Sequence, residues 1–183
     1  MNIGERIIGY MGNKKVLLQT DWFTIESREY PEFDDKPFLT MVTSNGVVIL
    51  TLTPEEKIVL VRQFRPALGK YTLEVPAGTV NEFESPEAAV ERELYEETGF
   101  RCHKVVQLNP RLAVMENRIS AYLYPFLGTG AKQDRDFRPK EKIQVVLVTL
   151  EEFKKLLICG EFSMTASAVV TLARLQGDCL KNF

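Results

Sequence analysis

Histidine is almost missing from this chain of 183 residues, in which His103 is the single example. Zinc sites built on an HExxH helix, and metal sites that need several histidines, are therefore excluded. Whatever chemistry the protein carries out has to rely on carboxylates, hydroxyls, thiols or cationic side chains.

Cysteines and long apolar runs are also scarce. The three cysteines, Cys102, Cys159 and Cys179, are odd in number and have no metal-ligand spacing, which favours reduced thiols. No segment approaches the roughly 18 apolar residues of a transmembrane helix. The first residues, MNIGERIIGYMGNKK, carry scattered charges and no apolar run of signal-peptide length. We therefore expect a cytoplasmic protein that does not bind membranes.

A basic excess is missing too, since the net charge is −2. Nothing in the composition therefore predicts binding to nucleic acid or to an anionic membrane. Apolar residues make up 45% and charged residues 26% of the chain, as in an ordinary globular protein. The length suits one well-packed domain.

Short β-like runs alternate with helix signals along the chain. The runs KKVLLQ, WFTIESREY and PFLTMVTS lie in an amino-terminal strand region, residues 1–45. The main domain, 46–183, has strand signals at 46–52, 57–64, 71–76, 104–108, 119–127 and 143–148, and helix signals at 85–99, 150–157 and 163–175. This order predicts an α/β/α sandwich with a mixed β-sheet. Residues 129–140 are predicted to form a long, mobile polar loop.

The helix predicted at 85–99 has the most informative sequence. Ser85 is its expected N-cap, Pro86 its first residue, and Gly99 its stop. Residues 78–100 contain seven of the 25 acidic residues but a single basic one, Arg92.

At helical spacing, Glu93, Glu96 and Glu97 lie on one side, together with apolar residues that would pack against the sheet. Most acidic runs are solvated helix faces. Like charges on a packed side repel one another, however, and therefore require a cation.

The spacing of residues 78–100 is far more specific than their acidity. Gly78, five residues, Glu84, seven residues and then RELYEETGF match the Nudix box, GX5EX7REUXEEXGU, at every defined position. The chain thus resembles the Nudix hydrolases, which implies the Nudix fold.

The resemblance also implies roles for the box residues. Glu93, Glu96 and Glu97, with the carbonyl of Ala77, would hold divalent cations. Oxygen ligands of this kind suit Mg²⁺, with Mn²⁺ as the alternative. Arg92 would orient a box carboxylate, Glu84 would tie the loop to the helix, and Gly78 would allow a tight backbone turn.

The residues before the box narrow the resemblance. IVLVRQFRPALGKYTLEVPAG is similar to the corresponding stretch of ADP-ribose and ADP-sugar pyrophosphatases. In that subfamily an arginine at the position of Arg65 contacts the substrate phosphates, and Glu74 would lie beside the metal site. A surface arginine and an exposed strand glutamate are the structural alternatives.

Dimeric members of this subfamily clamp the adenine between aromatic residues of amino-terminal strands from both subunits. We therefore expect a C₂ homodimer with Trp22 and Phe38 near the substrate, although core packing explains either aromatic equally well. Phe23 could replace Trp22, because a slip of one residue exchanges the faces of a strand. Met115 is also assigned to substrate binding.

Two features of the later chain bear on the reaction. The stretch NPRLAVMENR, 109–118, lacks the Pro-Gly pair that many relatives carry near the distal sugar. The general base of the subfamily is a glutamate just before a later strand, and Glu141 occupies the best matching position. Glu116 and Asp136 are the competing candidates, and a solvated loop charge is the alternative for Glu141.

The expected reaction is metal-assisted hydrolysis of the diphosphate of a nucleotide sugar. ADP-ribose would give AMP and ribose 5-phosphate, with water attacking one phosphorus in line. The alternatives are a GDP-mannose or UDP-glucose hydrolase, a nucleoside triphosphate hydrolase, an RNA-decapping enzyme, or an inactive nucleotide-binding regulator. A regulator would normally have lost box carboxylates, and none is lost here. Decapping is disfavoured because the chain has no basic stripe.

Overall fold

The structure is a computed structural model that describes residues 14–30, 34, 36–108, 111–115, 117–138, 142–159 and 162. Contacts divide the chain into two compact units. The smaller unit comprises Met1–Ser44 and Ala113–Ala121, and the larger comprises Asn45–Leu112 and Tyr122–Phe183. The helix predicted at 163–175 lies outside the described residues.

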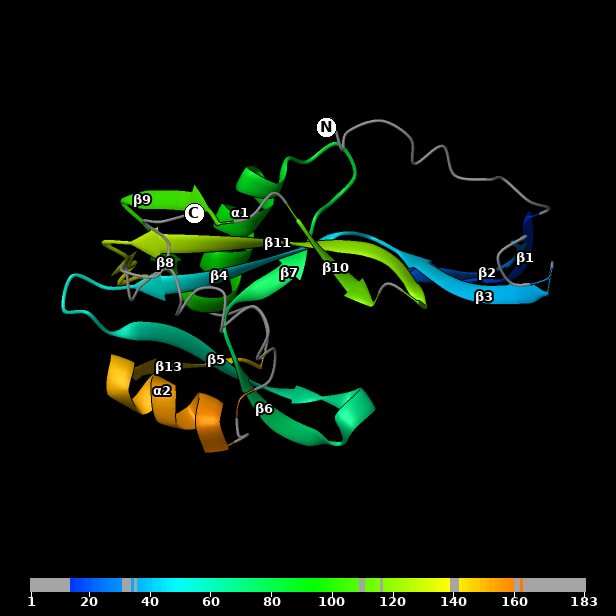
Figure 1. Ribbon diagram of the computed structural model, residues 1–183. Helices are drawn as coiled ribbons and strands as arrows, with labels where there is room; N and C mark the ends of the chain where they lie inside the picture. Colours follow the sequence, from blue (N-terminus) through cyan, green and yellow to red (C-terminus); the bar gives the residue numbers. More distant parts are fainter. Residues whose placement is uncertain are drawn as a thin grey trace, which may run out of the picture. The chain divides into compact units, whose positions relative to one another are not determined.

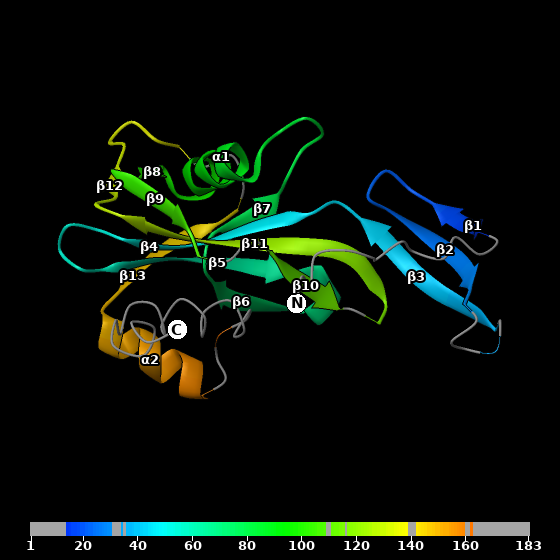
Figure 2. The ribbon, with the colours of Figure 1, turned by 45° about the horizontal axis from the view of Figure 1, so that its top comes forward.

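The smaller unit contains an antiparallel three-stranded ladder (Figure 2) that follows the three β-like runs before residue 45. The strands are β1 (Lys14–Gln19), β2 (Phe23–Glu29) and β3 (Pro37–Thr43). The start of β11 (Ile119–Thr129) pairs in parallel with β3. β10 (Leu112–Met115), which was not predicted, pairs with β11.

A buried carboxylate connects β1 to β2. Glu26 is only 3% exposed and forms salt bridges with Lys14 of β1 and with Arg28 of β2. Hydrogen bonds from these two cations hold the pKa of Glu26 below its usual value, against the effect of burial. The apolar side chains of β1 are not buried: Val16, Leu17 and Leu18 are each about half exposed to solvent.

The larger unit is built on a mixed sheet around β4 (Gly46–Leu52), labelled in Figure 1. β4 pairs in parallel with β11, and antiparallel with β5 (Ile58–Arg65) and β7 (Ala77–Thr79). β5 continues through the short 3₁₀ helix η2 (Pro66–Leu68) into its hairpin partner β6 (Lys70–Glu74). The remaining pairings are β5 with β13 (Gln144–Val148) and β11 with β9 (Lys104–Gln107).

Helices cover both faces of this sheet: α1 (Pro86–Thr98) on one side and α2 (Leu150–Cys159) on the other (Figures 1 and 2). Successive side chains of a strand point to opposite faces. Val47 and Ile49 of β4 accordingly pack in the cluster that contains Ala89, Val90 and Leu94 of α1. Val48 and Leu50 pack in the cluster that contains Phe153 of α2. This arrangement is the α/β/α layering with a mixed sheet that the strand and helix signals predicted.

The segment predicted as a long mobile loop, 129–140, is partly ordered against α1, and the prediction is wrong in this respect. Lys132 and Gln133 form β12, which pairs with β8 (Phe100–Arg101) directly after the helix. Two-residue strands of this kind have no detectable apolar alternation, and the polar composition of the segment concealed them. Within the part of the chain that the structure describes, no helix is both long and apolar enough to cross a membrane.

Candidate active site

Glu93, Glu96 and Glu97, here called the acidic stripe, lie on a helix that begins and ends at the residues predicted from the sequence. The Oγ of Ser85 accepts a hydrogen bond of 3.2 Å from the Ala88 N–H, which caps the amino end. Gly99 has a φ of 72° and donates its N–H to the Tyr95 carbonyl, which ends the helix in a left-handed residue. Both terminal signals are confirmed. They fix where α1 begins and ends, and the packing of Ala89, Val90 and Leu94 against Val47 and Ile49 of β4 sets the direction of its carboxylates.

Arg92 is the centre of the carboxylate cluster. Its Nε and Nη2 donate to the two oxygens of Glu84, each at 2.8 Å, in a bidentate pair. Its Nη1 donates to Glu93 at 2.8 Å and to Glu96 at 3.2 Å, and Nη2 also donates to the Thr79 carbonyl. Three carboxylates at −1 and one guanidinium at +1 leave these four groups with a formal charge of −2. A divalent cation would complement that charge.

Glu84 locks the loop that precedes the helix. In addition to its pair with Arg92, it accepts the Asn81 N–H at 3.0 Å. The hydrogen bonds from Arg92, and then the one from Asn81, lower the pKa of Glu84 to about 2. Glu84 was expected to tie the loop to the helix, and it bonds to Asn81 in the loop and to Arg92 in the helix.

Gly78 lies against the Glu93 carboxylate, a contact that the residues alone did not predict. Positive φ values among the described glycines occur at Gly69, Gly99 and Gly130, so Gly78 does not need a left-handed backbone. A Cβ atom built on Gly78 would lie 2.0 Å from the Cδ of Glu93. The same Glu93 carboxylate accepts the Thr79 N–H at 3.1 Å. A side chain at position 78 would therefore force the Glu93 carboxylate to move.

Glu97 is the buried member of the acidic stripe, with 8% exposure. Its Oε2 accepts the backbone N–H of Ala77 at 3.1 Å, which joins the helix to β7. Glu97 and Glu93 thus bind the first and the last backbone N–H of β7, those of Ala77 and Thr79. Among the described residues, however, no three His, Cys, Asp or Glu side chains converge as a ready-made metal site. The donor set fits a hard cation chemically, and binding it would require these carboxylates to move closer together.

Arg65 and Glu74 form a second charged pair, on the hairpin of β5 and β6. The Nε of Arg65 donates to Glu74 Oε1 at 2.8 Å, and Nη2 donates to Oε2 at 2.5 Å. Glu74 is 2% exposed. Burial opposes its ionisation, but the hydrogen bonds from Arg65 and Thr72 outweigh burial and leave its pKa below the usual value. Glu74 is therefore not the exposed strand residue of the structural alternative.

The segment after β12 is attached to the helix by contacts that the residues alone did not predict. The Tyr95 hydroxyl donates to Asp134 at 3.0 Å, and Phe137 packs edge-on against the Tyr95 ring. The Asp134 N–H bonds to the Gly99 carbonyl at 2.9 Å. The segment that leads toward residue 141 is therefore joined to the box helix as far as Phe137.

The remaining predicted site residues fall into two groups. Trp22, Phe38 and Met115 belong to the smaller unit: Trp22 is 81% and Met115 55% exposed, while Phe38 is half-buried with the Arg118 guanidinium 4.2 Å from its ring centre. Of the candidates for the general base, Glu141 and Glu116 lie outside the described residues. Asp136 is exposed, and its N–H donates to Asp134.

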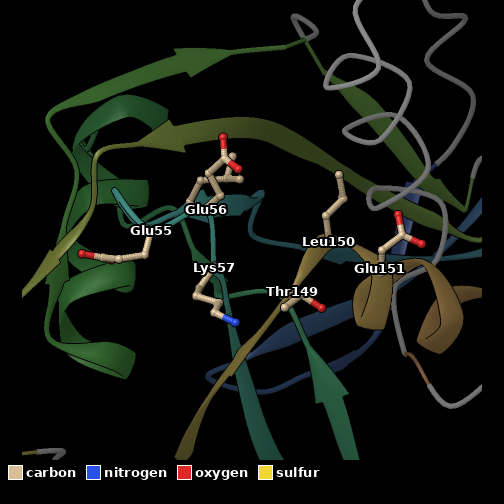
Figure 3. Close-up of a pocket in the computed structure, with 7 residues that line it drawn as sticks. Glu55, Glu56, Lys57, Thr149, Leu150 and Glu151 are labelled. Atoms are coloured by element: carbon tan, nitrogen blue, oxygen red, sulfur yellow. The ribbon is translucent and has the colours of Figure 1, made fainter.

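One surface hollow lies apart from these residues, between the turn that joins β4 to β5 and the start of α2 (Figure 3). Its volume is about 440 Å³, and its lining is Leu52, Glu55, Glu56, Lys57, Thr149, Leu150 and Glu151. Three carboxylates and one lysine make this hollow net acidic, so it would repel a diphosphate. It also contains none of the predicted site residues.

Comparison with known proteins agrees with the fold and the box. The family sequence model described as NUDIX domain matches residues 42–164. The fold resembles that of a crystal structure described as an ADP compounds hydrolase, with a TM-score of 0.76 and 19% identity over 91% of this chain and 94% of that chain. The chain belongs to the Nudix family, which confirms the resemblance inferred from residues 78–100.

Curated relatives match parts of the chain. The ADP-ribose pyrophosphatase of Bacillus subtilis (strain 168) is 34% identical over 117 residues, which are 61% of this chain and 62% of that protein. The ADP-sugar pyrophosphatase of Mus musculus is 49% identical over 63 residues, or 32% of this chain and 29% of that protein. The chain therefore spans less than two thirds of the length of either relative.

Proposed function

We propose that this protein is a Mg²⁺-dependent pyrophosphatase that hydrolyses the diphosphate of a nucleoside diphosphate sugar, with ADP-ribose as its substrate. The observation that carries the proposal is the complete carboxylate cluster of α1 around Arg92, which is bonded to β7. β7 begins at Ala77, three residues after Glu74 of the Arg65–Glu74 pair. The preference for an ADP-sugar is supported by the names of both curated relatives.

The proposed cation ligands are Glu93, Glu96 and Glu97, with the backbone of Ala77 beside them. Mg²⁺ is favoured because the donors are carboxylate oxygens, and Mn²⁺ would fit the same set. When bound, the cation neutralises the charge that develops on the phosphoryl oxygens. Arg92 stays paired with Glu84 and keeps the loop in place.

The other residues orient the substrate and move a proton. Arg65 contacts the diphosphate, and Trp22 and Phe38 hold the base, with Met115 nearby. A water oxygen forms a bond to one phosphorus, the bridging P–O bond breaks, and Glu141 accepts the proton of the water. AMP and ribose 5-phosphate leave without a covalent enzyme intermediate.

A panel of nucleotide sugars with Mg²⁺ tests the proposed function. ADP-ribose should be cleaved to AMP and ribose 5-phosphate, with a higher kcat/KM than GDP-mannose or UDP-glucose, as measured by chromatography of the products. EDTA should abolish the reaction in every case. Preferential cleavage of GDP-mannose or UDP-glucose would replace the proposed substrate by the alternative. Binding of ADP-ribose without cleavage would indicate a nucleotide-binding regulator.

We also propose that the protein is a C₂ homodimer assembled through the smaller unit. Val16, Leu17 and Leu18 on β1 leave about half of their surface uncovered, and Trp22 leaves 81%. An exposed apolar edge of this kind is a ready surface for a second copy. Light scattering at micromolar concentration should give twice the 20.9 kDa of one chain. A mass of one chain would contradict the dimer, and would exclude a base clamp shared by two subunits.

A further inference from the structure

We infer that Thr72 and Glu74 are positioning residues that hold the guanidinium of Arg65 in the orientation needed to bind a diphosphate. The inference rests on the proposed function, because that function makes Arg65 a phosphate ligand. It changes the role expected for Glu74, from a residue beside the metal to one that acts through Arg65. It also adds Thr72, which no sequence motif singled out.

The register of the β5–β6 hairpin brings the three side chains to one face. Gln63 lies opposite Thr72, and the neighbouring same-face pairs are Val61 with Glu74 and Arg65 with Lys70. Side chains two residues apart on a strand share a face. The Arg65 side chain therefore reaches back across the Gln63–Thr72 pair to meet Glu74.

The hydrogen bonds form a short chain that ends at the guanidinium. A threonine hydroxyl has one proton to donate. The Thr72 hydroxyl lies 2.5 Å from Glu74 Oε1 but 3.4 Å from the Gln63 carbonyl, so the proton belongs to the glutamate. Glu74 in turn accepts from Nε and Nη2 of Arg65. Thr72 and Glu74 are 6% and 2% exposed, whereas the Arg65 side chain is 41% exposed.

Such an arrangement can orient a phosphate-binding arginine at low entropic cost. A long side chain with 41% of its surface exposed would otherwise sample many rotamers. The bidentate pair fixes the plane of the guanidinium through its Nε–Nη2 edge, and the Nη1 edge is then held in a defined direction. Binding a diphosphate to a group already held in place loses less conformational entropy.

The same bonds argue against a direct metal role for Glu74. Two carboxylate oxygens offer about four lone-pair positions, and three of them accept protons from Arg65 and Thr72. The lone-pair position that is left, on Oε2, lies beside the Arg65 guanidinium, whose positive charge would repel a cation. The hydrogen bonds therefore favour a role of Glu74 in positioning Arg65 over a role as a metal ligand.

The test compares Thr72→Val with Thr72→Ser, and Glu74→Gln alone with the same change in an Arg65→Ala background. Binding of ADP-ribose is measured by calorimetry in EDTA, and kcat/KM is measured with Mg²⁺. Thr72→Val should weaken binding about 5-fold and Glu74→Gln about 10–100-fold, the effects of losing a neutral and a charged buried hydrogen bond. Thr72→Ser should retain wild-type binding, and Glu74→Gln should weaken binding by no more than about 2-fold once Arg65 is alanine.

A second readout needs no substrate. The NMR signal of the Arg65 Nε–H should be protected from exchange with water in the wild-type protein and in Thr72→Ser, and should lose protection in Thr72→Val and Glu74→Gln. Thermal unfolding confirms that each variant is folded. Loss of protection with unchanged ADP-ribose binding would overturn the role of the pair in diphosphate recognition.

Two further results would contradict the inference in different ways. Full additivity in the Arg65→Ala background, with a higher Mg²⁺ requirement for Glu74→Gln, would assign Glu74 to the metal. Unchanged Nε–H protection in Thr72→Val would remove Thr72 from the chain of bonds. If the wild-type protein neither binds nor cleaves ADP-ribose, the proposed substrate is wrong, and the protection experiment still decides whether Arg65 is held by Thr72 and Glu74.

Discussion

Replacing Glu97 by glutamine should leave the protein folded and lower its turnover of ADP-ribose by about 10³-fold or more. The amide oxygen of glutamine can still accept the Ala77 N–H that Glu97 accepts at 3.1 Å, so the contact between α1 and β7 survives. The negative charge does not survive, and with it goes a ligand for the cation that stabilises charge in the transition state. The measurement is kcat with saturating Mg²⁺, together with a thermal unfolding curve.

Glu91→Gln is the matched control for Glu97→Gln. Glu91 belongs to the same helix but is exposed and has no part in the Arg92 cluster. The substitution removes the same charge from the other side of α1 and should change kcat less than about 3-fold, as for a surface site. A folded Glu97→Gln protein with near-normal turnover would show that the acidic stripe is not the active site.

Glu141→Gln should lower kcat by about 10²–10⁴-fold and leave KM almost unchanged, the usual result of removing a positioned general base. In the sequence Glu141 lies between Lys140 and Lys142. The chain that leads toward it is joined to α1 through Asp134 and Phe137. Single-turnover kinetics separate the chemical step from product release.

The competing carboxylates provide the comparison for Glu141. Asp136→Asn and Glu116→Gln should each reduce kcat far less than Glu141→Gln. If Glu116→Gln is the damaging change, the general base belongs to the loop between β10 and β11. If all three variants stay active, the water must be activated by another group.

The box helix could be predicted from the residues because its signals are local. Ser85, Pro86 and Gly99 each act on the backbone within one turn, and all three have the expected roles. The buried positions of α1, such as Ala89 and Leu94, follow from helical periodicity. The resemblance to the box implied that Arg92 pairs with a box carboxylate, and in the structure it forms a bidentate pair with Glu84, eight residues before it in the sequence.

Contacts that depend on strand register could not be predicted in the same way. Arg65 and Glu74 were expected to contact substrate and metal separately, but the hairpin places them in one bidentate pair. The role of Thr72 could not be predicted from the sequence, because threonine is common in β-strands. Its hydrogen-bond partners become known only with the register of the hairpin. The contact between Tyr95 and Asp134 joins residues 39 positions apart, and no periodicity reports it.

The close approach of Glu93 to Gly78 has a consequence for how these positions can vary between relatives. The glycine is set by the volume of a neighbouring side chain and not by its own backbone angles. Any larger residue at 78 would be compatible only with a shorter or redirected group at 93, and redirecting Glu93 would move a proposed cation ligand. A substitution at position 78 is therefore expected to depend on the residue at position 93, and the reverse.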